Sequence, residues 1–266
     1  MTYAKMGLDY YTVVFGVETM KKTNERYIFA YLNNISKSFG KVNALKDVSI
    51  EIYKNNITAI VGDNGSGKST LIKILSGSLK PDTGNIYIEG KHYKYLTPKL
   101  AYENGIATVY QDLSLDNYRD VAGNIFLGKE ITRFGFIIDY KEMNRQTELF
   151  LNSLDINIPY LRTPVGYLSG GQRQSVAIAR AIYQGRNLII FDEPTAAMGV
   201  KESKATNRLI KSLPEKGFTV LVVSHDMHQI FDIADRILIM RNGEIIEDVM
   251  KSETTPMELI ERISGE

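Results

Sequence analysis

Short apolar runs separated by turn residues dominate the first hundred positions of the chain. The runs are rich in β-branched and aromatic residues, and they predict strands at residues 31–36, 46–53, 57–62, 85–90 and 106–110. Helices are predicted between them at residues 68–77 and 97–105, and a Pro-Asp-Thr-Gly turn stands at residues 81–84. Strands therefore alternate with helices from the beginning of the regular pattern.

Residues 113 to about 184 show helical periodicity and no strand pattern. Three helical segments are predicted, at residues 118–128, 141–154 and 170–185. The connecting stretches at residues 134–139 and 156–168 carry no element of their own in this interpretation. The whole region is predicted to be a helical subdomain inserted into the fold.

Strands resume after the helical region as continuous apolar runs at residues 187–191 and 218–224. Runs of this kind are typical of parallel strands that are buried on both faces. Helices predicted at residues 201–213 and 227–234 alternate with them, and residues 236–250 predict two strands around an Asn-Gly turn. The pattern indicates an α/β fold with a doubly wound, mostly parallel sheet.

Composition and charge exclude several classes of protein. The chain of 266 residues carries 32 basic and 31 acidic residues, so no global field attracts nucleic acid, and no nucleic-acid partner is expected. It has no cysteine, and no apolar run is long enough to span a bilayer. Residues 1–28 lack the features of a signal peptide and are predicted to be an extension outside the domain at residues 29–266. We expect a cytoplasmic protein.

A glycine-rich loop lies between the predicted strand at 57–62 and the helix at 68–77. Its sequence, GDNGSGKST, matches the G-x-x-x-x-G-K-[ST] pattern of phosphate-binding loops in the required strand-to-helix context. Lys68 is expected to reach the β- and γ-phosphates, and Ser69 to supply a hydroxyl to Mg²⁺. The residues predicted to bind nucleotide are Gly62, Asn64, Gly65, Ser66, Gly67, Lys68, Ser69 and Thr70.

The apolar run at 188–191 ends in two acidic residues, Asp192 and Glu193. A strand of this kind places Asp192 at the carboxyl edge of the sheet, where open α/β sheets bind ligands. We expect Asp192 to hold Mg²⁺, mainly through its water shell, and Glu193 to act as the general base for an attacking water.

A second glycine pair opens the helix predicted at 170–185. Ser169 and Gln172 have the spacing of a capping box, and Gly170 and Gly171 leave backbone N–H groups bare at a helix N-terminus. This anion site has no lysine and no metal carboxylate of its own. We infer that two copies pair head to tail, so that the helix start of one closes over the phosphate loop of the other.

Five motifs occur in one order along the chain: GDNGSGKST, VYQD, LSGGQRQ, LIIFDEPT and VVSHD. In this order and spacing, residues 31 to about 250 resemble the ATP-binding cassette ATPases, which are phosphate-loop NTPases with a small antiparallel sheet near the N-terminus. The stretches around Gln111, Ser169 and Glu193 resemble more closely the ATP-binding subunits of bacterial carbohydrate importers, especially single-cassette ones of the fructose and ribose type.

The resemblance implies further roles and partners. Gln111 would contact Mg²⁺ and the γ-phosphate and link them to the helical subdomain, His225 would contact the γ-phosphate and position water, and Phe39 would stack on adenine. The alternative for Phe39 is an aromatic ring packed within the small sheet. The implied partners are a transmembrane permease, a second cassette, most simply an identical copy, and indirectly an extracytoplasmic solute-binding protein. The implied location is the cytoplasmic face of the membrane.

Phe126 and Leu127 are the candidate docking surface for the permease, and core packing in the helical subdomain is the equal alternative. The chain departs from the family at residues 196–199, where Ala-Ala-Met-Gly replaces the more common Ser-Ala-Leu-Asp and leaves the residue that joins the two active sites unassigned. His228 lies three residues after His225, but no third metal ligand is near. The alternative functions are a soluble ATPase of the same fold outside transport and a monomeric phosphate-loop kinase.

Overall fold

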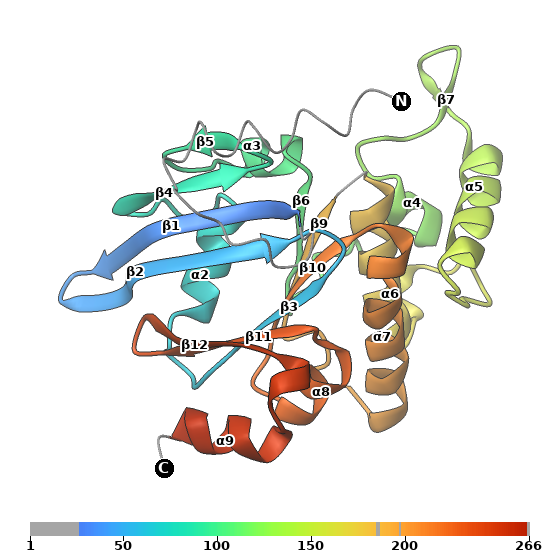
Figure 1. The fold of residues 1–266 in the computed structure, drawn as a ribbon. Helices are drawn as coiled ribbons and strands as arrows, with labels where there is room; N and C mark the ends of the chain where they lie inside the picture. Colours follow the sequence, from blue (N-terminus) through green and yellow to red (C-terminus); the bar gives the residue numbers. More distant parts are fainter. Residues whose placement is uncertain (1–26, 185–186, 197, 265–266) are drawn as a thin grey trace, which may run out of the picture.

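The computed structural model describes residues 27–184, 187–196 and 198–264. Its main sheet has six strands, β3 (Ile57–Val61), β6 (Ile106–Val109), β9 (Leu188–Asp192), β10 (Thr219–Val223), β11 (Arg236–Arg241) and β12 (Glu244–Met250). They lie in the order β12-β11-β3-β10-β9-β6, and all are parallel except β12, which forms an antiparallel edge (Figure 1). The doubly wound, mostly parallel sheet expected from the sequence is confirmed.

A second sheet of four antiparallel strands covers one side of the molecule. It consists of β1 (Ile28–Phe39), β2 (Val42–Tyr53), β4 (Thr83–Ile88) and β5 (Lys91–Tyr93), in the order β2-β1-β4-β5. The helix α2 (Lys68–Leu75) packs between the two sheets, because Leu71 and Ile72 share one buried cluster with Leu32 of β1 and Leu221 of β10. This cluster fixes the helix that follows the glycine-rich loop against both sheets.

The remaining helices of the described residues are α3 (Pro98–Glu103), α4 (Val121–Ile125), α5 (Tyr140–Ser153), α6 (Gly170–Tyr183), α7 (Val200–Ser212), α8 (Met227–Ile233) and α9 (Pro256–Ser264). The helices α4 to α8 bury their apolar faces in a second cluster on the opposite side of the main sheet, together with Phe191 and Val222. Short 3₁₀ turns occur at Val165–Tyr167, Pro214–Lys216 and Lys251–Glu253. None of the helices among the described residues is long and apolar enough to cross a membrane.

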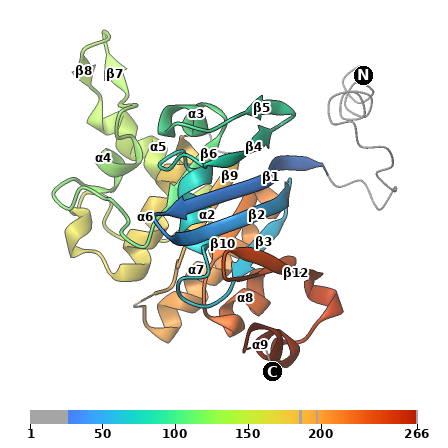
Figure 2. The same cartoon turned by 90° about the vertical axis from the view of Figure 1, so that its left-hand side faces the viewer.

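The region at 113–184 contains α4, α5 and α6, as the sequence predicts, and one element that it does not predict. The stretch at 134–139, expected to be a plain connection, forms part of a hairpin of β7 (Thr132–Arg133) and β8 (Ile137–Ile138). The hairpin projects from the body of the molecule (Figure 2). Residues 1–26 of the expected N-terminal extension lie outside the described residues, and β1 begins at Ile28.

Phe126 corrects one sequence-based interpretation. Its side chain is fully buried, with the ring centroid 4.4 Å from that of Tyr183, so it belongs to the core of the helical region. Only Leu127 of the predicted docking pair is exposed. The pattern could not separate the two because adjacent residues at a helix end point in different directions.

Candidate active site

The parallel strands of the main sheet end side by side at one edge. Asp192 of β9 stands opposite Val223 of β10, Val223 opposite Ile60 of β3, and Phe191 opposite Val109 of β6. The chain leaves each strand at the same level, because the register is unbroken across these four strands. This register therefore brings four parts of the site to one edge of the sheet. They are the phosphate loop, the acidic pair Asp192 and Glu193, the segment after β10 that contains His225, and the segment after β6 that contains Gln111, called the Gln111 segment below.

The phosphate loop requires glycine at the two positions where it approaches other backbone. A Cβ atom on Gly62 would lie 2.0 Å from the carbonyl oxygen of Met240, and one on Gly67 would lie 2.5 Å from that of Ala44. Gly67 also adopts a positive φ of 111° as the N-cap of α2. Any side chain at these positions would push the loop out of its place.

The turn between β11 and β12 is hydrogen-bonded to the phosphate loop. The backbone N–H of Gly243 donates to the carbonyl of Ser66 at 2.9 Å, and the carbonyl of Gly243 accepts from Lys46 at 2.8 Å. The predicted Asn-Gly turn therefore does more than reverse the chain. It ties the loop to the β1–β2 sheet.

Lys68 occupies the inside of the loop. Its Nζ donates to the carbonyl oxygens of Gly62 and Asp63 at 2.7 Å each, and it lies 3.3 Å from Ser66 Oγ. Burial lowers the pKa of Lys68, and the nearby carboxylates of Glu193, Asp63 and Asp192 act in the opposite direction. The ammonium group is held at the place where a phosphate would meet the loop.

The start of α2 leaves its backbone amides without a side-chain cap. Ser69 is exposed, Thr70 is half-buried, and the first turn of the helix contains no acidic residue. Unsatisfied N–H groups and the positive end of the helix dipole face the same place as Lys68. This combination binds phosphate oxygens.

Asp192 is a carboxylate in a partly desolvated place. Burial raises its pKa, the charge of Glu193 raises it further, and Lys73 and Lys68 partly compensate. A cation would relieve this cost. No group of three acidic or histidine side chains suited to a metal occurs among the described residues, so any Mg²⁺ must be completed by water and by ligand oxygens. Mg²⁺ commonly binds in this way, through one or two carboxylates and phosphates, so Asp192 and Ser69 fit it.

Glu193 is held by side chains of the next strand end. Its Oε1 lies 2.8 Å from His225 Nδ1, and its Oε2 accepts from Ser224 Oγ at 3.3 Å. The backbone of Glu193 has a φ of +52°, and its N–H donates to the carbonyl of Val223 at 2.9 Å. The positive φ turns the side chain away from the strand direction and toward His225.

The network continues behind Glu193 into two helices. Ser224 Oγ also lies 3.1 Å from Gln229 Oε1, and Gln229 Nε2 donates to Asn207 Oδ1 at 3.0 Å. A hydroxyl has one proton, so Ser224 serves Glu193 or Gln229 but not both at once. Ser224 therefore lies between Glu193 and the hydrogen-bonded pair of Gln229 on α8 and Asn207 on α7, and it donates to only one side at a time. Sequence analysis missed Ser224, Gln229 and Asn207, because no local pattern marks a contact between separate elements.

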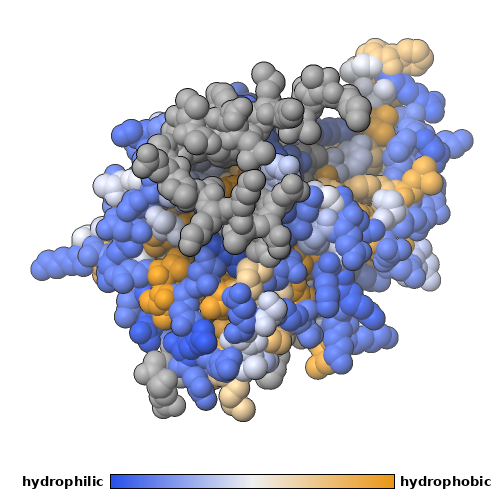
Figure 3. Space-filling model, viewed as in Figure 1, coloured by the Kyte–Doolittle hydropathy of each residue, from blue (hydrophilic) through white to orange (hydrophobic). Residues whose placement is uncertain are grey.

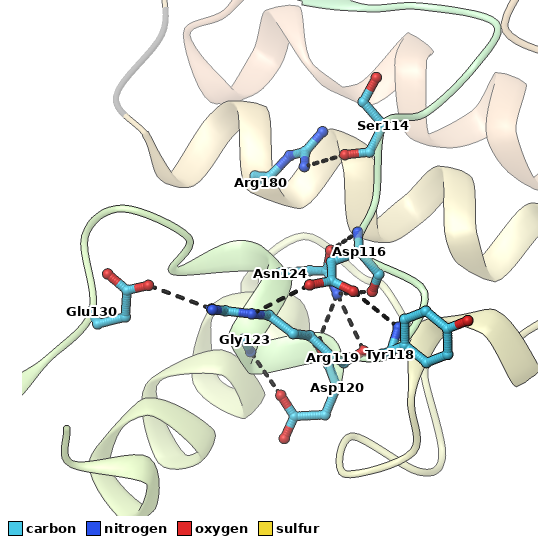
Figure 4. A network of polar contacts seen from close by, with 9 residues as sticks. All are labelled: Ser114, Asp116, Tyr118, Arg119, Asp120, Gly123, Asn124, Glu130 and Arg180. Atoms are coloured by element: carbon cyan, nitrogen blue, oxygen red, sulfur yellow. Dashed lines mark hydrogen bonds and ion pairs between the residues drawn. The ribbon is translucent and has the colours of Figure 1, made fainter.

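Gln111 is exposed and lies two residues after the end of β6, the strand that pairs with β9. The segment after it is fastened to the helical region (Figure 4). Buried Asn124 donates from Nδ2 to the carbonyls of Asp116, Arg119 and Asp120, and its Oδ1 accepts from the N–H of Asp116.

Arg180 of α6 adds a second fastening to this segment. It donates to the carbonyls of Leu113 and Ser114, at 2.9 Å each. Arg180 is largely desolvated, and this burial lowers its pKa. The Gln111 segment is therefore attached directly to the helix that carries the second glycine pair.

Phe39 ends β1, and its side chain is 51% exposed. The ammonium group of Lys37 lies 5.7 Å from the ring centroid. The ring is not packed inside the small sheet, which was the alternative to stacking on adenine. Its place on the open end of the sheet leaves one face available to a ligand.

The second glycine pair forms the capping box that the sequence predicts. The N–H of Gln172 donates to Ser169 Oγ at 3.4 Å, and the N–H of Ser169 donates to Gln172 Oε1 at 3.0 Å. A Cβ atom on Gly171 would lie 3.2 Å from Cβ of Glu202, so α6 packs closely on α7 here. Within the described residues no hydrogen bond or ion pair joins this segment to the phosphate loop.

The structure thus gathers one set of predicted site residues at the edge of the main sheet and leaves the other apart. The set at the edge comprises the phosphate loop, Gln111, Asp192, Glu193 and His225, whereas Ser169 to Gln172 stand at the start of α6. The side chain of His228 and the whole of Ala197 lie outside the described residues. The fold and this edge define a nucleoside-triphosphatase with a phosphate-binding loop.

Comparison with known proteins places the chain within this class. Residues 45–196 match the ABC transporter family, and the chain belongs to this family. The chain is 44% identical to the xylose/arabinose import ATP-binding protein XylG of Sulfolobus acidocaldarius, over 86% of this chain and 91% of that protein. It is 39% identical to the fructose import ATP-binding protein FrcA of Rhizobium meliloti, with the same coverage of each chain.

The ribose import ATP-binding protein RbsA of Yersinia pestis is longer. The chain is 36% identical to it over 88% of its own length but spans only 46% of that protein. Among solved structures, a nucleotide-free ATP-binding cassette from an ABC transporter superposes with a TM-score of 0.75 at 30% identity, covering 90% of this chain and 96% of the other. A dimeric cassette bound to ADP and phosphate superposes with a TM-score of 0.71 at 29% identity, over 84% and 98%.

Proposed function

We propose that this protein is the ATP-hydrolysing subunit of an ABC importer for a sugar, working as a dimer on the cytoplasmic face of the membrane. The observation that carries the proposal is the edge of the main sheet, where Lys68, Asp192 and the bonded pair of Glu193 and His225 converge. The sugar class is supported by the import proteins for xylose or arabinose, fructose and ribose that the chain resembles.

In the proposed reaction, Glu193 accepts a proton from the water that attacks the γ-phosphorus, and the bond to the β-phosphate oxygen breaks to release ADP. His225 and Ser224 orient the carboxylate through its two oxygens. Lys68 and the amides at the start of α2 stabilise negative charge on the phosphoryl oxygens. Gln111 would contact the γ-phosphate, and Phe39 would stack on adenine.

Mg²⁺ would be held by Ser69 and Asp192, with Gln111 as a further oxygen ligand. When bound, the ion neutralises charge on the phosphate oxygens. The raised pKa of Asp192 supports this assignment, because a desolvated carboxylate beside Glu193 is stabilised by a cation. Ser69 supplies the uncharged oxygen ligand from the first turn of α2.

The site would be completed by a second copy of the chain. Ser169, Gly170, Gly171 and Gln172 form a helix start that can bind phosphate but has no lysine of its own. A head-to-tail dimer would bring this start over the phosphate loop of the other copy, and the similar cassette bound to ADP and phosphate is a dimer. ATP then closes the two copies, and hydrolysis lets them separate.

The permease is proposed to dock in a cleft between the main body and the helical region. The cleft has a volume of about 390 Å³ and is lined by Tyr102 of α3, Tyr110 and Leu113 of the Gln111 segment, Leu127, and Arg180 of α6. A permease segment bound in this cleft would contact both the Gln111 segment and α6, the helix that begins with the second glycine pair. Motion between the two could then be passed to the membrane.

Leu127 offers a test of the docking cleft. It is 39% exposed and lines the cleft, whereas Leu149 of α5 is also exposed and does not line it. Leu127→Asp should abolish recruitment to membranes that contain the permease, and Leu149→Asp should leave it unchanged. Equal recruitment of both variants would place the docking surface elsewhere.

The central test is the dependence of ATP hydrolysis on protein concentration. A shared site requires two copies, so the rate per chain should rise with concentration until the dimer is populated. A monomeric kinase would give a constant rate per chain and would need a small-molecule acceptor. An ATPase outside transport would show the same concentration dependence but no acceleration by permease-containing membranes.

A further inference from the structure

The hairpin of β7 and β8 is the most exposed apolar feature among the described residues. Phe134 is 86% exposed and Phe136 is 77% exposed, Ile137 is about half exposed, and Ile138 is more than half buried. Soluble proteins rarely leave contiguous apolar side chains of this size exposed without a partner. Apolar atoms gather over this projection at the upper right of the space-filling view (Figure 3).

The hairpin is fixed firmly to the helical region. Asp139 accepts from Arg133 Nε at 2.5 Å across the base of the hairpin, and its N–H donates to the carbonyl of Ile131 at 2.7 Å. The same carboxylate caps α5 by accepting from the N–H of Glu142 at 3.1 Å. Asp139 therefore holds the two arms together and joins them to a 14-residue helix.

Two carboxylates near the base of the hairpin lie close to arginine side chains. Asp139 is paired with Arg133, and Glu130 lies 3.5 Å from Arg119. The tip from Arg133 to Ile138 has no acidic side chain, and Lys141 beside it is exposed. No acidic side chain within the tip itself opposes contact of the two phenylalanines with anionic lipid headgroups.

The hairpin lies on the same side of the molecule as the proposed permease cleft. Leu127, which lines the cleft, is separated from β7 by only four residues. The helix α3 lines the cleft through Tyr102. In Figures 1 and 2, α3 and the hairpin both lie toward the top of the molecule, and α9 lies at the bottom. If the permease occupies the cleft, the tip points toward the membrane.

We propose that the hairpin tip, residues 133–138, inserts its phenylalanines into the headgroup region of the lipid bilayer beside the permease. The inference rests on the proposed function for the orientation of the molecule. A narrow convex finger suits a soft lipid interface, whereas a protein partner would need a matching pocket. Aromatic side chains are favoured at this depth of a bilayer. Because Asp139 joins the hairpin to α5, the tip gives the helical region its own contact with the membrane.

The chain contains no tryptophan, which allows a direct test. Phe136→Trp places the sole tryptophan at the tip, and Met257→Trp is a matched control on α9, where Met257 is 70% exposed. Each full-length variant is titrated with vesicles of roughly three parts phosphatidylcholine to one part phosphatidylglycerol, with and without bromine on the acyl chains. We expect the emission of the Phe136→Trp variant to shift to shorter wavelength and to be quenched by the brominated lipid, and that of the control to remain unchanged.

The proposal is overturned if the Phe136→Trp emission does not respond to lipid, or responds no more than that of the control. It is also overturned if a response requires permease in the vesicles and bromine does not quench it, because the tip then contacts protein. As a second measurement, Phe134→Ser with Phe136→Ser should lose flotation with the vesicles and keep the wild-type rate of ATP hydrolysis. Hydrolysis is measured on the same preparations, so an inactive wild-type protein would refute the proposed function separately from the lipid contact.

Discussion

Two helices of this protein begin with glycine-rich segments, and their beginnings differ. The start of α2 has no side-chain cap, and Lys68 and the carboxylate of Asp192 stand beside it. The start of α6 is capped by its own Ser169 and Gln172. It lies apart from the sheet edge that carries Lys68 and the acidic pair. The first start lies beside a lysine and two carboxylates, whereas the second has backbone amides with Arg173 in the same turn and Glu202 of α7 packed against Gly171.

The difference shows that a helix N-terminus is not a nucleotide site by itself. The amides and dipole at such a start contribute modestly when exposed to water, whereas a lysine, a metal carboxylate and a base supply the charge and chemistry. The start of α6 is therefore better suited to complete a site than to form one. Substitutions that affect one start and spare the other can test this division.

Glu193→Gln should have the largest effect. The amide cannot accept the proton of the attacking water, so phosphate release is expected to fall by about 10²- to 10⁴-fold while ATP binding is retained. Phosphate release and equilibrium ATP binding would be measured on the same protein. The exposed Glu215→Gln is the matched control and should hydrolyse normally. Steady-state hydrolysis at the wild-type rate by the Glu193 variant would remove Glu193 from the reaction.

Ser169→Arg should separate the two helix starts. A bulky side chain at the start of α6 removes the cap and blocks close approach of another phosphate loop, so hydrolysis is expected to fall by about a hundredfold. ATP binding at the α2 start should not change. Light scattering on a sizing column, with Glu193→Gln and Mg²⁺-free ATP, should show a dimer that the added Ser169→Arg substitution abolishes.

Ser169→Thr retains a capping hydroxyl and is the control for this variant. It should dimerise like the parent protein. A dimer that persists in the Ser169→Arg protein would mean that the start of α6 does not face the partner's nucleotide.

Phe39→Ala should weaken ATP binding at the site that contains the phosphate loop. Loss of stacking on adenine is worth about 1–3 kcal/mol, which corresponds to an ATP affinity weaker by about 5- to 150-fold. Isothermal titration would measure the change, with Phe39→Tyr expected to retain affinity. Val42→Ala, at an exposed neighbour of Phe39 on β2, should also bind normally. Unchanged affinity in the Phe39→Ala protein would show that the exposed ring does not touch the base.

The effect expected for Asp192→Asn is the smallest of these predicted effects, and it concerns the stability of the fold. It should also depend on pH. The pKa of Asp192 is raised in the folded protein, mainly by burial, so the folded state binds the proton more tightly than the unfolded chain does. The ionised carboxylate therefore reduces stability above the folded pKa, and this cost disappears as the pH falls below the unfolded value of about 3.9.

Without nucleotide or Mg²⁺, Asp192→Asn should raise the melting temperature near pH 7.5 by about 2–4 °C, on the order of 1 kcal/mol for a domain of this size. The difference from the wild type should shrink as the pH approaches 4. Asp155→Asn, at an exposed position, is the control and should melt like the wild type. A lower melting temperature for Asp192→Asn at neutral pH would show that the carboxylate is stabilised rather than strained by its surroundings.

The parts of the fold that could be predicted from sequence are those in which local pattern and burial coincide. The continuous apolar runs at 57–61, 188–191 and 219–223 became the central parallel strands, and the cap of Ser169 and Gln172 formed as expected. Phosphate-loop glycines follow a fixed spacing because backbone must approach backbone there, and sequence records this constraint directly.

The parts that could not be predicted depend on contacts between distant segments or on unusual exposure. Phe126 and Leu127 look alike in sequence, but one is buried and the other is exposed. The Phe134 and Phe136 pair suggested no element because its apolar residues have no core to enter. Ser224 lies between Glu193 and the pair of Gln229 and Asn207 on α8 and α7, and no spacing rule predicts contacts between these separate elements.

The fastening of the Gln111 segment has a mechanical consequence. Asn124 ties the backbone at Asp116, Arg119 and Asp120, and Arg180 fixes the carbonyls of Leu113 and Ser114. The connection between the strand β6 and the α6 helix therefore has almost no slack, since only Tyr110 to Asp112 remain without these anchors. A connection this short cannot accommodate a shift of Gln111 by changing its own conformation. A shift of Gln111 would therefore displace the helical region as well.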